Sequence, residues 1–339
     1  MLQQHLLGCA IVVLVLSSLW LVPGGWAQPK FEDMAVVTGA ATGTYFRFGH
    51  DLAEVARQAG LQIVVKESKG SLDNIRLLVS KENATLGIVQ SDVLGFLSRS
   101  NDPTMRRIAS KLRLITPFYN EEVHLFTRTE IQHIENLRGK RVVLGLRGSG
   151  TWLTATNLLN VLNITPAERL ELPPPEAVHA VLTGKADAMF YVAGKPTPLF
   201  VNLANVGNEP RYAEMMKHVH FVPIQNPKTL REYLPSSLNA QDYAWWGKAV
   251  ETVAVKSMLI SFNFAGKSPY HQHRCGQLAL LGKVVREQLA SLQSRGHPKW
   301  KEVRLDEQDA GIWRRDACSQ GGTQRALEDD ILKCLKGSC

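Results

Sequence analysis

Between residues 34 and 92 the sequence alternates between short apolar runs and segments with helical spacing. The runs MAVVTG, LQIVVKES and ATLGIVQSD have the length and the β-branched content of buried strands. The segments between them, YFRFGHDLAEVARQAG and SLDNIRLLVSKEN, place apolar residues three and four positions apart, as helices do. We expect Ser71 to cap the second of these helices. The strand–helix–strand–helix–strand order predicts a parallel sheet that is covered by helices.

The same alternation starts again after a long extended segment at 113–128, which indicates a second lobe of the same α/β class. We expect the second lobe to be inserted into the first, with the chain crossing near 121–125 and 220–225, where a hinge would lie. The expected segments are a first lobe in two parts (28–121 and 223–300), an inserted second lobe (122–222) and a cysteine-containing C-terminal tail (301–339).

The first 27 residues differ from the rest of the chain. A long apolar run is followed by Gly25-Trp26-Ala27, the small-x-small pattern of a signal-peptide cleavage site. No Lys or Arg precedes the run, so a retained membrane anchor is the alternative. Lipid attachment at Cys9 is disfavoured because this cysteine precedes the apolar core. We therefore expect residues 1–27 to be a signal peptide and the protein to be exported to the periplasm.

Four cysteines remain once the leader is removed: Cys275, Cys318, Cys334 and Cys339. An even number in an exported chain favours disulfides. Four cysteines allow three pairings, among which we prefer Cys275–Cys318 and Cys334–Cys339. A metal site at HQHRC (271–275) is the alternative, but its spacing matches no standard zinc motif. We expect neither a metal nor another cofactor.

The net charge is +8, and the basic residues are spread along the chain rather than clustered. This distribution argues against nucleic-acid binding and is compatible with a small anionic ligand. We expect a monomer.

Two loops, TGAATGTYF (38–46) and GLRGSGT (145–151), each join an apolar strand to a helix through Gly, Ser and Thr. The free N–H groups of a first helical turn, together with the helix dipole, favour an anion. Neither loop matches a nucleotide-binding motif. Ligands of open α/β sheets bind beyond the carboxyl ends of the strands, so we expect both loops to face one shared cleft.

Six segments between about residues 35 and 265 resemble, in the same order, those of TAXI-family solute receptors, the extracytoplasmic binding subunits of TRAP transporters. These segments are TGAATGTYF, SKGSLDNIRLL, LGIVQSD, EEVHLFTR, LRGKRVVLGLRGSGT and ADAMFYVAGKPTP. The resemblance implies a type II periplasmic-binding-protein fold, in which two α/β lobes joined by a hinge close over a small ligand. It also implies a carboxylate ligand, such as glutamate, glutamine or 2-oxoglutarate, and a sodium-coupled TRAP permease as the partner.

Carried over by motif, the resemblance implies ligand contacts from both lobes. They are Gly43, Thr44, Tyr45, Ser71, Asn74, Gln90, Ser91, Asp92, Ser149, Gly150, Thr151, Tyr191 and Gly194. Backbone amides and hydroxyls would meet carboxylate oxygens, and Asp92 or Glu121 could meet an ammonium group. The structural alternative for Asp92 is a helix cap, and that for the two tyrosines is a core position.

The sequence departs from the family at Arg47, Lys69 and Arg147, where small or apolar residues are usual. Basic residues beside two anion-binding loops favour a ligand with more than one negative charge, unless their side chains point into solvent. We therefore add Arg147 to the expected contacts and expect a dicarboxylate, another polyanionic metabolite or a glutamate-like acid. The tail beyond about 265 matches the family poorly.

An enzyme is the less favoured alternative. The loop at Ser149 is not a G-x-S-x-G nucleophile elbow, because Arg147 stands two positions before the serine. The histidines are scattered and form no paired metal motif. A third possibility is a periplasmic sensor or adaptor that retains the binding fold without a permease.

Overall fold

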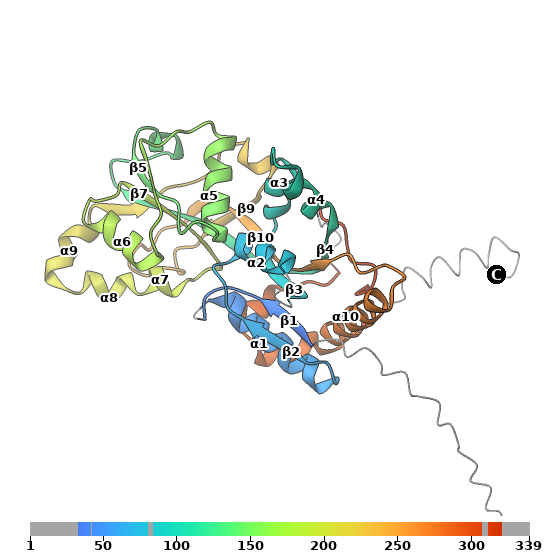
Figure 1. Cartoon of the computed structure of the whole chain (residues 1–339). Coiled ribbons are helices and arrows are strands. Elements are labelled where there is room, and N and C mark those ends of the chain that lie inside the picture. Colours follow the sequence, from blue (N-terminus) through green and yellow to red (C-terminus); the bar gives the residue numbers. More distant parts are fainter. Residues whose placement is uncertain (1–32, 42, 81–83, 307–310, 321–339) are drawn as a thin grey trace, which may run out of the picture. The chain divides into compact units, whose positions relative to one another are not determined.

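The computed structural model describes residues 33–320 except 42, 81–83 and 307–310 (Figure 1). The expected signal peptide, Cys334 and Cys339 lie outside these residues. Within the described part of the chain, no helix has both the length and the apolar character needed to cross a membrane.

Ten strands form one mixed sheet with the order β2-β1-β3-β10-β4-β7-β5-β6, while β8 pairs with β4 and β9 with β10. β1 pairs in parallel with β2 and β3, and β5 pairs in parallel with β6 and β7. The α/β class predicted from the sequence is confirmed. The strands are β1 (Met34–Val37), β2 (Ile63–Lys66), β3 (Leu86–Gln90), β4 (Leu112–Arg128), β5 (Arg141–Val143), β6 (Glu168–Leu170), β7 (Ala188–Ala193), β8 (Val219–Phe221), β9 (Leu234–Leu238) and β10 (Val250–Phe262).

Helices cover the sheet, and the predicted helices α1 and α2 are present. α1 buries Phe48, Leu52 and Val55, as their spacing predicts, and the chain turns after it at Gly60 with φ +80°. The helices are α1 (Thr44–Gln58), α2 (Ser71–Val79), α3 (Val93–Ser98), α4 (Pro103–Lys111), α5 (Gly150–Val161), α6 (Pro174–Leu182), α7 (Pro198–Val201), α8 (Leu203–Gly207), α9 (Pro210–Met216) and α10 (Pro269–Arg295), with 3-10 turns η1 (Ile134–Leu137), η2 (Thr229–Arg231) and η3 (Pro298–Glu302).

β4 and β10 are long antiparallel strands that run through both lobes. One end of β10 pairs with β3 of the first lobe, and its other end pairs with β9. The register between β4 and β10 shifts between Lys256 and Met258, opposite Asn120 and Pro117. The two crossings between the lobes therefore lie side by side, in the middle of these two strands.

The return crossing lies further along the chain than the 220–225 expected from the sequence. Ile224, Tyr233 and Val253 pack in the same core as Val123 and Leu158 of the second lobe. The apolar run at 250–262 forms a single strand, so the change of lobe occurs inside β10 rather than in the loop before it.

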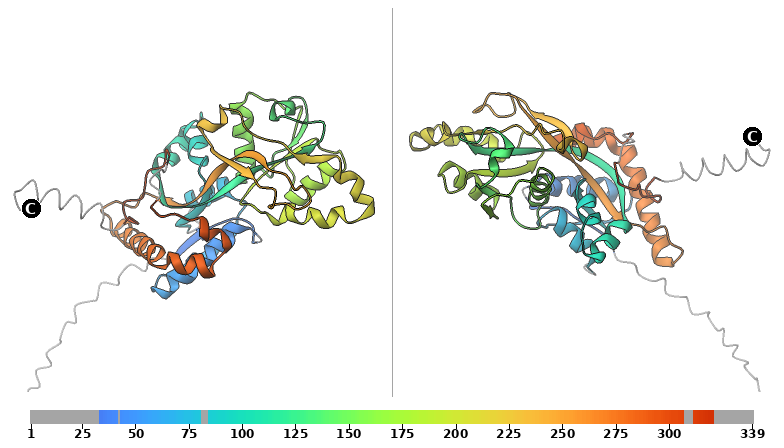
Figure 2. Two further views of the ribbon diagram at one scale, coloured as in Figure 1. Left: turned by 180° about the vertical axis from the view of Figure 1, so that it is seen from behind. Right: turned by 90° about the horizontal axis from the view of Figure 1, so that it is seen from above.

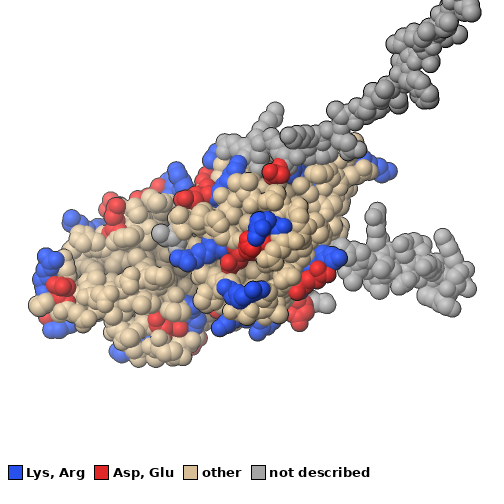
Figure 3. Space-filling view, turned by 90° about the horizontal axis from the view of Figure 1, so that it is seen from below, with Lys and Arg blue, Asp and Glu red and all other residues tan. Residues whose placement is uncertain are grey.

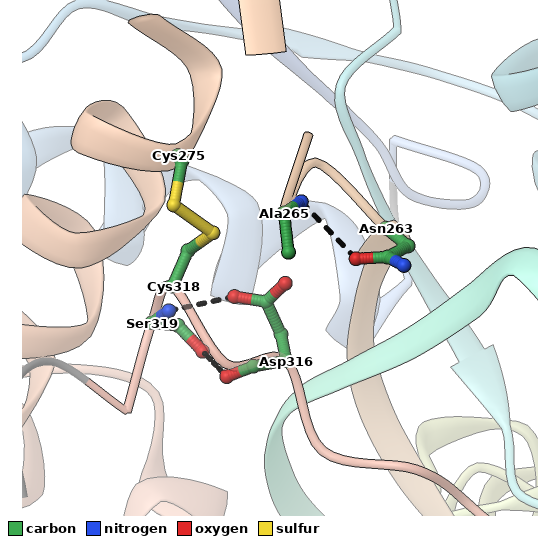
Figure 4. Close-up of a disulfide and its surroundings, with 6 residues drawn as sticks. All are labelled: Asn263, Ala265, Cys275, Asp316, Cys318 and Ser319. Atoms are coloured by element: carbon green, nitrogen blue, oxygen red, sulfur yellow. Dashed lines mark hydrogen bonds between the residues drawn. A yellow bond between two sulfur atoms is a disulfide. The ribbon is translucent and has the colours of Figure 1, made fainter. Parts of the chain in front are cut away.

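The C-terminal part of the described chain packs on the first lobe. α10 lies alongside α1, and the two share one apolar core (Figure 2). The disulfide Cys275–Cys318 joins α10 to the segment after it (Figure 4). Arg315 of that segment forms a parallel bridge with Leu114 of β4. The preferred pairing of these two cysteines is confirmed, and the Cys275 sulfur is therefore not a free metal ligand.

Candidate functional site

The two lobes enclose a cavity of about 810 Å³. The loop before α1, the start of α2 and the end of β3 line it from the first lobe. The start of α5, the end of β7 and the following loop line it from the second lobe, and η3 contributes from the C-terminal region. A second depression, of about 380 Å³, is lined by Arg141 and Asp187, which already pair with each other at 2.6 Å. The larger cavity is therefore the candidate site.

The loop before α1 brings a helix start to the cavity without a side-chain cap. Gly43 is the N-cap residue and has no side chain that could accept from the first-turn amides. Thr44 and Tyr45, the first two residues of α1, line the cavity. The first N–H groups of a helix lack partners within the helix, so this end can donate to an anion.

The loop before α5 brings a second helix start to the same cavity. Gly145 and Gly148 have φ values of +88° and +92°, which glycine adopts readily. Ser149 is the N-cap residue, and its Oγ accepts from the Trp152 N–H at 3.1 Å. The structure thus brings the two predicted loops together at one cavity.

The lobes approach each other closely at Gly150 and Gly70. A Cβ atom on Gly150 would lie 2.2 Å from Gln90 Oε1, and a Cβ on Gly70 would lie 3.4 Å from the Gly150 backbone nitrogen. Gly70 also has a φ of +113°, which disfavours other residues. Glycine at both positions lets the α2 and α5 starts lie against each other beside the cavity.

A buried carboxyl group lines the cavity at Glu121. The Tyr45 hydroxyl donates to Glu121 Oε2 at 2.7 Å, and the Tyr119 hydroxyl lies 3.5 Å from Oε1. Burial raises the pKa of Glu121 to about 7, because the charged form loses its hydration. The pKa of Tyr45 is raised well above its usual value by burial and by the neighbouring Glu121.

Four Lys and Arg side chains line the cavity. Lys299 Nζ lies 2.6 Å from Glu302, and Lys195 Nζ contacts Asp242 at 3.3 Å. Arg47 and Lys69 are exposed, and no carboxylate of the described residues forms an ion pair with either of them. These two cations therefore remain available to a ligand at the first-lobe side.

The 3-10 turn η3 is held against α1 by Asp51, whose Oδ2 accepts from the His297 N–H and from Trp300 Nε1. Trp300 stacks on Phe48 with a centroid distance of 4.4 Å. These contacts place Lys299 at the cavity, where its side chain lies next to Gly194. Sequence reasoning missed η3 because it lies in the region beyond 265, where the family resemblance ends.

Most of the residues implied by the resemblance line the cavity. They are Gly43, Thr44, Tyr45, Ser71, Gln90, Ser149, Gly150, Thr151, Tyr191 and Gly194. The remaining three, Asn74, Ser91 and Asp92, are not among the lining residues, and neither is Arg147, which was added for its charge.

The amide of Asn74 is a buried structural group. Its Nδ2 donates to the carbonyls of Thr38 and Ile88, both at 2.6 Å, and so links the residue after β1 to the middle of β3. Ser91 has a comparable role, because its Oγ accepts from the Lys256 N–H at 3.1 Å. Both side chains support the loops that line the cavity.

Asp92 bridges the lobes rather than facing the cavity. It accepts from Thr154 Oγ1 at 2.9 Å and from the Tyr233 hydroxyl at 3.3 Å. Asp92 is the N-cap residue of α3, the position that the alternative expected, but its side chain makes no capping hydrogen bond. Burial raises its pKa to about 6.

Two further expectations from the sequence are corrected. Arg147 points into solvent with 71% of its side chain exposed, where it pairs with Glu171 at 2.6 Å and lies over the Trp152 ring. Ser71 was expected to cap α2, but the N-cap residue is Gly70. The Ser71 Oγ instead accepts from the Gln90 N–H at 3.0 Å.

A family model described as NMT1-like family matches residues 36–307 of the chain. Among solved structures, the periplasmic binding protein BugD is 14% identical, with 92% of this chain and 99% of that chain covered and a TM-score of 0.47. MatC from Rhodopseudomonas palustris with bound malate is 15% identical, with 83% and 92% covered and a TM-score of 0.48. The arginine-, lysine-, histidine-binding protein ArtJ from Geobacillus stearothermophilus is 15% identical, with 82% and 98% covered and a TM-score of 0.44.

Proposed function

The chain belongs to the NMT1-like family, and on this premise we propose that it is an extracytoplasmic receptor that captures a small carboxylate between its two lobes. The observation that carries the proposal is the cavity of about 810 Å³, to which both lobes contribute hydrogen-bonding groups. Its volume falls within the range of about 300–1,000 Å³ that is usual for small-molecule sites.

Two helix starts on opposite lobes support an anionic ligand. The α1 start has no side-chain cap, and the α5 start lines the same cavity. Arg47 and Lys69 add positive charge at the first-lobe side. A carboxylate has two oxygens that can accept hydrogen bonds from such N–H donors. A cation or an apolar molecule has no acceptor of this kind.

Ligand contacts from both lobes also provide a mechanism for closure. A ligand that contacts both helix starts stabilises the closed arrangement of the lobes relative to an open one. Rotation would be absorbed where β4 and β10 cross between the lobes, near Asn120 and Lys256.

The proposal also includes export of the protein and delivery of its ligand to a membrane permease. The disulfide Cys275–Cys318 fits an oxidising compartment, in keeping with the signal peptide expected at 1–27. The six ordered motifs shared with TAXI receptors support a TRAP-type membrane permease as the partner of a monomeric receptor. In this role the protein binds and releases its ligand unchanged.

Charge reversal at the cavity tests the carboxylate proposal. In Arg47→Glu/Lys69→Glu, two cations near the ligand become anions, so we expect carboxylate affinity to fall about tenfold or more at low ionic strength. Calorimetric titration with butanoate, octanoate, succinate and glutamate would measure the change.

The matched control is Arg107→Glu/Lys111→Glu, which makes the same charge change at exposed positions of α4 away from the cavity. We expect it to bind nearly as the wild type does. Binding of none of the four acids to the wild type, or equal loss in both double variants, would refute the proposed site.

A further inference from the structure

The lobes line the cavity with different chemistry. The first lobe and η3 contribute Arg47, Lys69, Glu121, Lys299 and Glu302. Among the described lining residues of the second lobe, the only ionisable acid or base is Lys195, apart from the Tyr191 hydroxyl.

Lys195 already has partners. Its Nζ donates to the Ser237 carbonyl and lies 3.3 Å from Asp242 Oδ2, with only 16% of the side chain exposed. The described lining residues of the second lobe therefore offer a ligand no unpaired charge.

What the second lobe offers instead is an apolar wall, formed by Leu146, Leu172, Pro174, Ala177 and Met189. Ala177 and Met189 belong to the core of the second lobe, so this part of the wall is firmly supported. Leu146 is 41% exposed, so much of its apolar surface is open to a ligand. Covering such a surface with an apolar group is favourable, because it removes both surfaces from water.

We propose that the ligand is a monocarboxylic acid whose apolar chain or ring covers this wall, rather than a dicarboxylate. The inference rests on the proposed carboxylate receptor and specifies its ligand class. The carboxylate lies at the two helix starts, near Arg47 and Lys69, and the apolar body extends along Leu146 and Leu172. The cavity volume of about 810 Å³ accommodates such a body beside the head group.

A dicarboxylate fits this arrangement less well. With one carboxylate at the helix starts, an extended chain would bring the second one to the apolar wall. An ion that loses its hydration without a partner is strongly disfavoured. The exposed Arg47 and Lys69 lie on the opposite lobe and serve the first carboxylate.

A matched series of acids tests the ligand class by calorimetry. From butanoate to octanoate, we expect affinity to rise by up to about fourfold for each methylene group that becomes buried. Octanedioate has the same chain length as octanoate but a second carboxylate, and we expect it to bind at least about tenfold more weakly.

A substitution in the apolar wall tests whether the apolar part of the ligand lies there. Leu146→Gln replaces an exposed side chain without disturbing a core cluster, and we expect it to weaken octanoate binding about tenfold while butanoate binding changes little. Leu230→Gln is the control, because Leu230 is 46% exposed and lies outside the cavity lining.

The outcomes separate the two proposals. If octanedioate or succinate binds more tightly than octanoate, or if Leu146→Gln and Leu230→Gln behave alike, the apolar ligand class is wrong and the carboxylate receptor stands. If none of these acids binds, both proposals fail.

Discussion

At the scale of single residues, Glu121 is the most unusual group of the cavity. It is 6% exposed and has two tyrosine hydroxyls near its oxygens but no ion-pair partner among the described residues. Burial is the largest cause of its raised pKa, and the charge of Glu122 adds to it, while Lys299 acts in the opposite direction. A neutral Glu121 would not repel a bound carboxylate, and an ionised one would.

The raised pKa of Glu121 makes stability depend on pH. The folded carboxyl keeps its proton up to about pH 7, whereas the unfolded one loses it near 4.5. The folded state therefore binds more protons in this window, and stability falls as pH rises through it. We expect Glu121→Gln to remove about 2 kcal/mol of the decrease in unfolding free energy between pH 5 and pH 8, as measured by urea unfolding.

An exposed glutamate serves as the control for this experiment. Glu54→Gln changes a surface carboxyl that pairs with Arg57 and should leave the pH dependence of the wild type intact. Asp92, whose pKa is also raised, keeps its own contribution in both variants. Identical pH dependence in Glu121→Gln and the wild type would show that folding does not raise the pKa of Glu121.

At the scale of elements, the start of α5 combines two roles. Ser149 Oγ caps the helix, and Thr151 Oγ1 accepts from the Val192 N–H at 3.1 Å, which ties α5 to β7. Ser149→Ala should therefore lower the unfolding free energy by about 1 kcal/mol. Ser149→Asp keeps a capping acceptor and should keep stability, but its negative charge at the cavity should weaken carboxylate binding by about tenfold or more.

Thermal unfolding and calorimetric titration of these two variants separate the structural role of Ser149 from its role in binding. Loss of stability in both would mean that the cap depends on the serine itself. Unchanged carboxylate affinity in Ser149→Asp would remove the α5 start from the binding site.

The sequence predicted the helices and strands of the first lobe well, because residues close together in the chain determine them. The apolar spacing of α1 and the β-branched runs of β1–β3 are fixed by neighbours within a few residues. The position of the return crossing could not be predicted in this way. It depends on pairing between β10 and strands that are more than 100 residues away in the sequence.

The candidate site was predicted where a short motif carries it. The loops at Gly43–Tyr45 and Ser149–Thr151 reach the cavity because they directly follow the carboxyl ends of β1 and β5, one strand in each lobe. Lys299 and the wall residues Leu172, Pro174 and Ala177 lie outside the quoted motifs, and their place depends on how η3 and α6 pack. Arg147 was wrongly expected at the cavity. Its side chain turns outward to Glu171, and the sequence of a loop does not specify such a direction.

At the scale of the whole described chain, the lobes contact each other beside the cavity through polar groups. The Asp73 N–H donates to the Gly148 carbonyl at 3.3 Å, and Arg99 pairs with Glu232 at 3.0 Å. The side chains of Arg99 and Glu232 are 54% and 33% exposed, so this pair contributes little. On the face shown in Figure 3, basic and acidic side chains are interspersed, and neither sign of charge forms a large patch.

Asp92 is a buried residue among these polar contacts between the lobes, and it links the first lobe to Thr154 and Tyr233 of the second. A hydrogen bond to a charged group is worth about 1.5–3 kcal/mol, so its loss should favour an open arrangement of the lobes. We expect Thr154→Val, which keeps the side-chain shape, to weaken carboxylate binding about tenfold at pH 8, where Asp92 is ionised. Small-angle scattering should show a larger radius of gyration for this variant than for the control Thr183→Val, whose hydroxyl bonds only within the end of α6. Equal affinities and equal radii in the two variants would mean that closure does not depend on Asp92, and the binding energy of the ligand alone would then have to hold the lobes together.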